Sequence, residues 1–208
     1  MRLVDRDYVV FQEVERWRFC LGRHIKVLAG FTGQRACDRR LKALIDAGYI
    51  EREKVLYGVP SIYKLTYKAK MLIGTNKRQD KIRVDNIAHD IAVIDTAIYF
   101  NTHYQIPLNE IMTEKQLHSR DGFSIRKHQP DFIFTKNGNV YCVEVELSLK
   151  SSERLERNIK SNFGLYDTQI WAIEDLRLFS ALSDNKRQYP NIIIINIEEV
   201  KKYVRKIN

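Results

Sequence analysis

The sequence predicts an α+β protein in two parts, a helix-rich basic part followed by a larger part in which helices alternate with strands. The first observation is charge: residues 1–82 hold 18 Lys and Arg against 9 Asp and Glu, whereas residues 83–208 hold 17 of each. The second is periodicity, because apolar residues recur at helical spacing before residue 50 and in mixed helix and strand patterns after residue 83. With 208 residues, the chain is long enough for one large or two small domains. A localised basic field is typical of a nucleic-acid partner.

Three short helices are expected in the first 48 residues. The stretches "DYVVFQEVERWRF" and "GRHIKVLAG" carry apolar residues at helical spacing. The third stretch, "GQRACDRRLKALIDAG", has one apolar stripe and an opposite polar stripe that contains Gln34, Arg35, Asp38, Arg39 and Lys42. Gly48 follows at the position of a left-handed helix cap.

A two-stranded ribbon is expected next, from "YIEREKVLY", a "GVP" turn and "SIYKLT". Three helices and a ribbon are the order of a winged helix-turn-helix, here over residues 1–73, whose third helix enters the DNA major groove. Gln34, Arg35, Arg39 and Lys42 are therefore the candidate DNA-binding residues of that helix. The alternative is a solvated basic helix face, and the same fold also serves protein contacts.

Residues 74–82 contain the polar, basic "TNKRQDK" and are expected to be a linker to a second domain over residues 83–208. That domain begins with a helical pattern in "VDNIAHDIAVIDTAIYF". Strands are expected at "QIPLNEIMT", "DFIF" and "VYCVEVELSL", and Asn137-Gly138 is typical of a tight hairpin between the last two. Alternating helices and strands follow, which gives the order α-β-β-β-α-β-α-β-α.

Three acidic residues of this hairpin are the candidate metal ligands. Glu144 and Glu146 share one face of their strand because side chains alternate. Asp131 begins the preceding strand, so an antiparallel pairing brings it to the end where the glutamates lie. Clustered carboxylates repel unless a cation intervenes, and oxygen ligands suit Mg²⁺ or Mn²⁺. The sequence therefore predicts that all three residues bind one divalent cation; the alternative is an ordinary hairpin whose carboxylates are solvated.

Pro130-Asp131 and Glu144-Val145-Glu146, set in this element order, resemble the PD-(D/E)xK nuclease superfamily and its restriction-endonuclease-like α/β fold. Glu146 occupies the position of the usual Lys. Together with a winged helix, the chain resembles the replication-relaxation family, which overlaps the MOB-C class of plasmid mobilisation relaxases. The resemblance implies a catalytic site of Asp131, Glu144 and Glu146, joined by His89 and Asp90, the "HD" pair of the preceding helix.

The expected function is a divalent-metal-dependent DNA nicking endonuclease, relaxase-like, acting on plasmid or mobile-element DNA. Its nucleophile is water or a tyrosine, and Arg154 and Lys160 either hold the DNA backbone or form a solvated basic face. The alternative is a non-catalytic DNA-binding regulator of plasmid replication or mobilisation, with an inactive nuclease-like domain. DNA is the expected partner, and a homodimer or contacts with other replication or mobilisation proteins are further options.

The sequence also predicts a cytoplasmic protein that does not enter membranes. No apolar run reaches the length of a membrane span. The three cysteines are scattered, odd in number and without a C-x-x-C pair, which favours small core residues over a disulfide framework.

Overall fold

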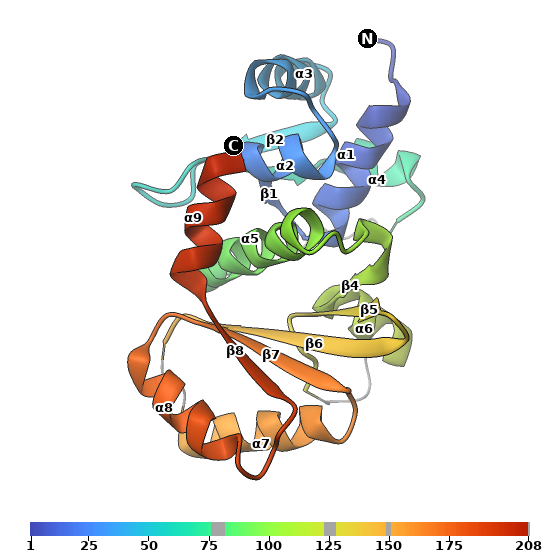
Figure 1. Cartoon of the computed structure of the whole chain (residues 1–208). Coiled ribbons are helices and arrows are strands. Elements are labelled where there is room, and N and C mark those ends of the chain that lie inside the picture. Colours follow the sequence, from blue (N-terminus) through green and yellow to red (C-terminus); the bar gives the residue numbers. More distant parts are fainter. Residues whose placement is uncertain (76–81, 123–127, 149–150, 208) are drawn as a thin grey trace. The chain divides into compact units, whose positions relative to one another are not determined.

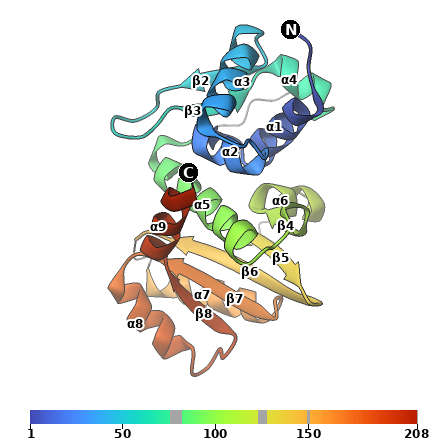
Figure 2. The same ribbon diagram turned by 45° about the horizontal axis from the view of Figure 1, so that its top comes forward.

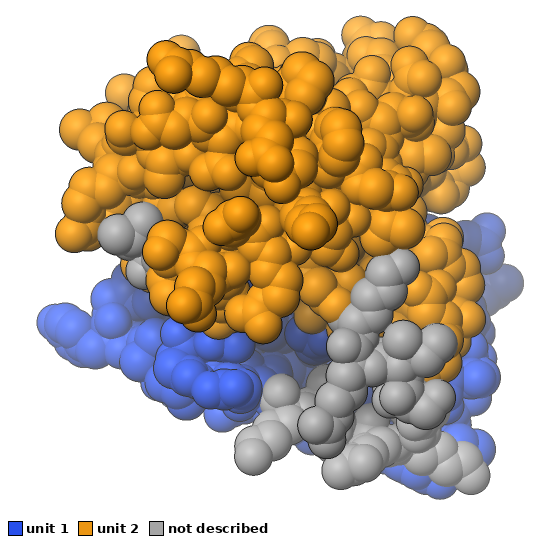
Figure 3. Space-filling model, turned by 90° about the horizontal axis from the view of Figure 1, so that it is seen from below, with its two compact units in different colours: residues 1–94, 208 blue, residues 95–207 orange. Residues whose placement is uncertain are grey.

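The computed structural model describes residues 1–75, 82–122, 128–148 and 151–207. It confirms a mixed α+β fold, with a three-stranded and a five-stranded sheet (Figure 1). The chain forms two compact units, Met1–Ile94 (unit 1) and Asp95–Ile207 (unit 2), which Figure 3 colours separately. Of the predicted linker, residues 76–81 lie outside the described residues.

Unit 1 contains the three expected helices and the expected ribbon. Its elements are α1 (Asp5–Arg16), β1 (Cys20–Leu21), α2 (Gly22–Leu28), α3 (Gln34–Asp46), β2 (Ile50–Glu53), β3 (Ile62–Leu65), α4 (Tyr67–Leu72), the 3-10 turn Val84–Asn86 and the first turns of α5 (Ile87–His103). The short strand β1 was not expected. It pairs with β3, so the sheet order is β1-β3-β2 and all pairs are antiparallel.

Helix α3 packs through the stripe that its sequence predicts. Cys37, Leu41 and Leu44 are buried. The helix ends at Asp46, and Gly48, two residues later, has a left-handed φ of 73°. The amide of Gly48 donates to the Ile45 carbonyl at 2.8 Å, and that of Tyr49 donates to Leu44 at 2.9 Å. These bonds satisfy the last carbonyls of the helix, so the predicted left-handed glycine cap is confirmed.

A buried ion pair ties α3 to the start of α1. The Asp7 carboxylate is fully buried and accepts hydrogen bonds from the Val4 amide at 2.8 Å and from Arg40 Nε at 2.7 Å. Nη2 of Arg40 also donates to it. This pair fixes α3 against α1 and leaves the opposite face of α3 to solvent.

Unit 2 contains the predicted order of elements and one additional helix. It holds the rest of α5, the 3-10 turn Leu108–Glu110, β4 (Ile111–Thr113), α6 (Glu114–Asp121), β5 (Phe132–Lys136), β6 (Asn139–Glu146), α7 (Ser152–Phe163), β7 (Thr168–Ile173), α8 (Leu176–Asn185), β8 (Ile192–Asn196) and α9 (Ile197–Ile207). Helix α6 is the addition. The sheet order is β4-β5-β6-β7-β8, antiparallel from β4 to β6 and parallel from β6 to β8.

The five-stranded sheet is covered on both faces. Helices α7 and α8 lie on one face, and α5 and α9 lie on the other (Figures 1 and 2). On the first face, Trp171 is fully buried in a cluster with residues of α7 and α8. On the second, the ring of Phe100 contacts Phe132 and Phe134 at 6.2 and 5.1 Å between centroids.

The turn between β5 and β6 and the outer strand β8 complete the sheet. Asn137 and Gly138 have φ values of 52° and 81°, which are the two left-handed positions of a type I′ turn, so the predicted tight hairpin is confirmed. β8 is the last strand on its side, and Ile193 is 45% exposed. None of the helices in the described ranges combines the length and apolarity needed to cross a membrane.

Candidate functional site

The exposed face of α3 presents the predicted basic stripe. Arg35, Arg39 and Lys42 are all exposed. Gln34 is half-buried, and its Nε2 donates to Asp38 Oδ1 at 2.7 Å. The three cations are therefore available to an anionic partner, while Gln34 is engaged by its neighbour on the same helix.

The sheet register brings Asp131 next to β6. Phe132 of β5 is opposite Val143 of β6, so Asp131 lies one residue further, at the level of Glu144. Its Oδ2 accepts a hydrogen bond from the Val145 amide at 2.7 Å. The structure therefore brings Asp131 and Glu144 together as the sequence predicts.

Glu144 is a buried carboxylate held by two donors. Only 3% of the residue is exposed. Its Oε1 lies 2.5 Å from His128 Nε2 and accepts from Asn162 Nδ2 at 2.8 Å. Burial raises the pKa of Glu144 and the charge of Asp131 raises it further, whereas the hydrogen bonds from His128 and Asn162 lower it. A carboxyl in this position is near both an imidazole and a second carboxylate, as acid–base or metal chemistry requires.

We call Asp131, Glu144, His128 and Asn162 the acidic site. The sequence interpretation missed two of its members, His128 and Asn162. His128 comes three residues before Asp131 in "HQPD", which placed it near the start of β5. Asn162 is on α7, the helix that follows β6, at a position buried against the sheet. A buried asparagine on that helix face was the available signal, because a core-facing polar group requires a partner.

Glu146 lies two residues beyond Glu144 on the same face of β6 and is also buried. Nevertheless, no three His, Cys, Asp or Glu side chains within residues 1–75, 82–122, 128–148 and 151–207 are grouped as a metal ion would require. A site made of all three carboxylates therefore stays a prediction.

The acidic site nevertheless has oxygen donors that suit a hard cation. Asp131 and Glu144 supply two carboxylates, and Mg²⁺ is commonly bound by one or two carboxylates together with waters. Asn162 Oδ1 is buried and has no hydrogen-bond partner among the described residues, so a third oxygen remains to be satisfied. The donor chemistry thus fits a divalent cation held by Asp131 and Glu144, with the amide oxygen of Asn162 as a further candidate.

Tyr166 lies close enough to Glu144 for the charge of that carboxylate to act on it. It packs against the buried cluster of Leu117, Ile133 and Cys142. Burial, then the neighbouring Cys142, raises its pKa to about 12, and the charge of Glu144 contributes in the same direction.

His89 and Asp90 lie in unit 1, on the first turns of α5. His89 Nδ1 is 3.4 Å from Asp90 Oδ1, and both side chains are partly exposed. The acidic site belongs to unit 2, so the participation of this pair in it stays a prediction.

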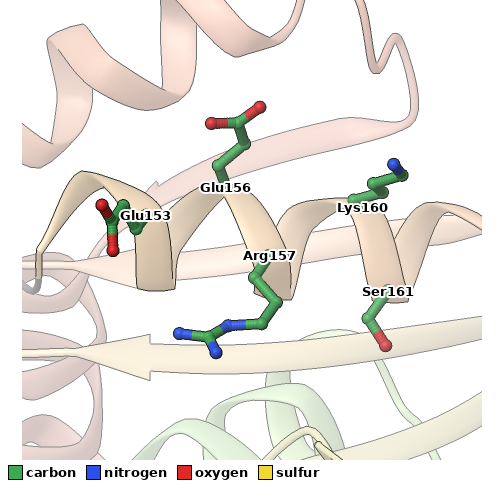
Figure 4. A pocket seen from close by; sticks show the side chains of 5 residues that line it. All are labelled: Glu153, Glu156, Arg157, Lys160 and Ser161. Atoms are coloured by element: carbon green, nitrogen blue, oxygen red, sulfur yellow. The ribbon is translucent and has the colours of Figure 1, made fainter.

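Arg154 and Lys160 are exposed on α7. Lys160 also borders a shallow depression of about 460 Å³ lined by Glu153, Glu156, Arg157, Lys160 and Ser161. Figure 4 shows Glu156 and Lys160 extending to one side of the helix and Arg157 and Ser161 to the other. Two acids and two bases line it, so its charge is balanced and does not select for phosphate.

No family model matches the chain, and no curated protein is significantly similar to it. The structure therefore defines an α+β protein of two units, with a basic helix face in the first and an acidic site in the second.

Proposed function

We propose that this protein is a divalent-metal-dependent DNA endonuclease that nicks plasmid or mobile-element DNA, in the manner of the replication-relaxation and MOB-C relaxase proteins that its motifs resemble. The observation that carries the proposal is the acidic site. A buried Glu144 and a neighbouring Asp131 meet at the end of the β5–β6 hairpin, on a sheet face covered by α7. A fold has little structural reason to bury a carboxylate beside another, because each disfavours ionisation of the other.

The order of elements supports the same interpretation in both units. Helix, strand, two helices and a ribbon, with the sheet order β1-β3-β2, fit a winged helix-turn-helix. A helix, three antiparallel strands, a helix and a parallel strand fit the PD-(D/E)xK core. In this proposal Arg35, Arg39 and Lys42 contact DNA, and an arginine can bind guanine in a bidentate manner.

The residues of the acidic site have separate roles in the proposed reaction. Asn162 and His128 fix the orientation of the Glu144 carboxylate, and His128 donates to it when Nε2 carries the proton. Asp131 Oδ2 accepts a hydrogen bond from the Val145 amide, so the backbone of β6 fixes the orientation of the Asp131 carboxylate. When bound, Mg²⁺ or Mn²⁺ polarises the phosphodiester and lowers the pKa of a coordinated water.

The test is nicking of supercoiled DNA from the protein's own element, with Mn²⁺ or Mg²⁺ and with EDTA. The wild type should convert supercoiled to open-circular DNA only with the metal. Glu144→Gln should abolish conversion and retain DNA binding. Glu153→Gln, an exposed glutamate on α7, is the matched control and should nick normally. Metal-independent nicking, or full activity of Glu144→Gln, would contradict the proposal.

DNA binding is tested separately through α3. Arg35→Ala and Arg39→Ala should each weaken binding by about 1–3 kcal/mol if the residue reads a base. Arg187→Ala, an exposed arginine outside α3, is the control. If both α3 variants bound DNA with the affinity of the wild type, α3 would not be the recognition helix.

A second candidate function is a non-catalytic DNA-binding regulator with a nuclease-like second unit. Glu146 in place of the usual Lys favours it. Sequence-specific, salt-sensitive DNA binding without nicking under any metal condition would select this candidate.

A further inference from the structure

A group of aromatic side chains gathers at the surface of unit 2, where the end of α5 meets α9. Tyr99 and His103 are stacked, with ring centroids 5.0 Å apart and an interplanar angle of 10°. Tyr203 meets Tyr99 and His103 edge-on at 5.3 and 5.1 Å, and Tyr104 meets Tyr99 edge-on at 5.5 Å. We call these four side chains, Tyr99, His103, Tyr104 and Tyr203, the aromatic platform.

The aromatic platform is fixed to the sheet beneath it. Phe100 stacks on Tyr104 at 5.4 Å and contacts Phe134 of β5 at 5.1 Å. Phe134 in turn stacks on Tyr141 of β6 at 4.9 Å. The surface rings are therefore held in place before any ligand arrives, which lowers the entropic cost of binding.

The outer rings remain accessible. Tyr104 is 43% exposed and His103 is exposed, while Tyr99 and Tyr203 are partly exposed. Hydrophobic folding does not require these rings at the surface, because Phe100, Phe132 and Phe134 already fill the core below them. Apolar side chains that are grouped at a surface, rather than scattered singly, are typical of binding sites.

The charges around the aromatic platform favour an anionic partner. Lys136 Nζ lies 5.8 Å from the centroid of the Tyr104 ring. Helix α9, which carries Tyr203, has four Lys and Arg residues against two Glu residues. Its Glu199 acts on Tyr99, and its Lys201 is paired with Glu198 and Glu174, so the excess positive charge comes from the remaining Lys and Arg residues. Burial, followed by a hydrogen bond with Tyr104, raises the pKa of Tyr99 to about 12, so this ring carries no negative charge at neutral pH. A neutral ring can stack on a nucleic-acid base, while the neighbouring cations attract the phosphate of the same nucleotide.

We propose that the aromatic platform binds single-stranded DNA by stacking bases on Tyr104 and His103, with Lys136 beside the phosphate backbone. Base stacking on aromatic side chains next to a positively charged track is the general chemistry of single-strand binding. The stacking itself goes beyond the proposed function, because none of its residues belongs to the acidic site. The choice of DNA over RNA does rest on the proposed function.

The test is binding of the full-length protein to a fluorescent oligothymidylate of about 12 nucleotides in EDTA, where no cleavage can occur. An abasic oligomer of the same length keeps the phosphates and removes the bases. Tyr104→Ala should weaken oligothymidylate binding by roughly 5- to 150-fold and leave abasic binding unchanged. Tyr104→Phe, which keeps the ring, should bind within about twofold of the wild type.

Two further variants separate stacking from charge and from general surface effects. Phe179→Ala removes a ring of α8 that is 53% exposed, and it should not change binding. Lys136→Ala should weaken both oligomers and reduce the slope of log affinity against log salt by about 0.7.

Three results would overturn the proposal. The first is equal affinity of Tyr104→Ala and wild type for oligothymidylate. The second is tighter binding of oligouridylate than of oligothymidylate, which would contradict the choice of DNA. The third is a change of sedimentation mass in Tyr104→Ala without a change in DNA affinity, which would make the aromatic platform an interface between copies of this chain. Because these assays contain EDTA, their failure is independent of any failure to nick DNA.

Discussion

Replacing His128 by Ala tests whether Glu144 is held as the structure describes. His128 Nε2 is 2.5 Å from Glu144 Oε1, and the side chain of Glu144 is 4% exposed. A hydrogen bond to a charged group contributes about 1.5–3 kcal/mol to stability, and the lower part applies where one partner is partly open to water, as His128 is. Asn162 keeps its bond to the same oxygen, so the carboxylate does not lose every donor.

The expected loss is therefore about 2 kcal/mol, which corresponds to a fall in melting temperature of roughly 4–8 °C for a chain of this size. The assay is urea unfolding in EDTA near neutral pH. His118→Ala is the matched control, because His118 Nε2 is 3.6 Å from Glu114 Oε1 in an exposed pair on α6. Exposed pairs contribute about 0–1 kcal/mol, so this control should change little.

A double-mutant cycle makes the reasoning refutable. In a Glu144→Gln background the partner of His128 is neutral, so His128→Ala should cost about 1 kcal/mol less than in the wild type. An equal cost in both backgrounds would show that His128 acts through packing rather than through Glu144. A cost no larger than that of His118→Ala would refute the buried interaction altogether.

Three other perturbations have defined outcomes. Burial raises the folded pKa of Glu144, so the protonated residue favours folding below the ordinary Glu pKa of about 4.3, and this contribution is lost as pH rises through the folded value. Glu144→Gln in EDTA should therefore gain stability relative to wild type as the pH is raised above about 4.3 in urea titrations. Arg40→Ala leaves the buried Asp7 without its cation and should cost about 3 kcal/mol by urea unfolding, whereas Arg177→Ala, whose pair is exposed, should leave the free energy of unfolding nearly unchanged; similar losses in both variants would contradict the burial argument. Gly138→Ala forces a side chain into a φ of 81° and should lower the free energy of unfolding by about 1–2 kcal/mol, and no loss would argue against the type I′ turn.

Local chemistry explains which elements the sequence predicted well. Helix α3 has an uninterrupted apolar stripe, and the left-handed cap that ends it requires a glycine. The β5–β6 hairpin carries Asn137-Gly138 between two apolar runs. In both cases the signal and its structural cause lie within one short segment.

Two elements were missed because their signals are weak or very short. β1 has only two residues, Cys20 and Leu21, and it exists because β3 pairs with it. Helix α6 buries only Leu117, so it has no apolar stripe to detect. Its start was marked by a capping box, in which the Thr113 amide donates to the Gln116 side chain at 2.9 Å, and that pattern was available in the sequence.

Only the part of the acidic site that depends on strand pairing, Asp131 beside Glu144, could be predicted from the sequence. Alternation and the hairpin turn placed Asp131 beside Glu144, since both rules act between neighbouring strands. Asn162 is 18 residues after Glu144 and donates a hydrogen bond to it from α7. This contact depends on how α7 packs on the sheet, which strand patterns do not predict. The linker expected at residues 74–82 stays a prediction, because residues 76–81 lie outside the described residues. The compact units divide after Ile94, and Ile87 and Ile91 on the first turns of α5 pack with Phe19, Leu21 and Ile62.

The outermost strand β8 has a consequence for how the protein behaves when it is concentrated or partly unfolded. Ile192 to Ile195 are four consecutive isoleucines at the edge of the sheet, without a Lys or Pro among them to discourage pairing. Segments with high β-propensity and no charge are those that self-associate as stacked strands. Aggregation on heating should therefore begin at this strand, and a lysine at Ile193, which is 45% exposed, should delay turbidity with little loss of folded stability.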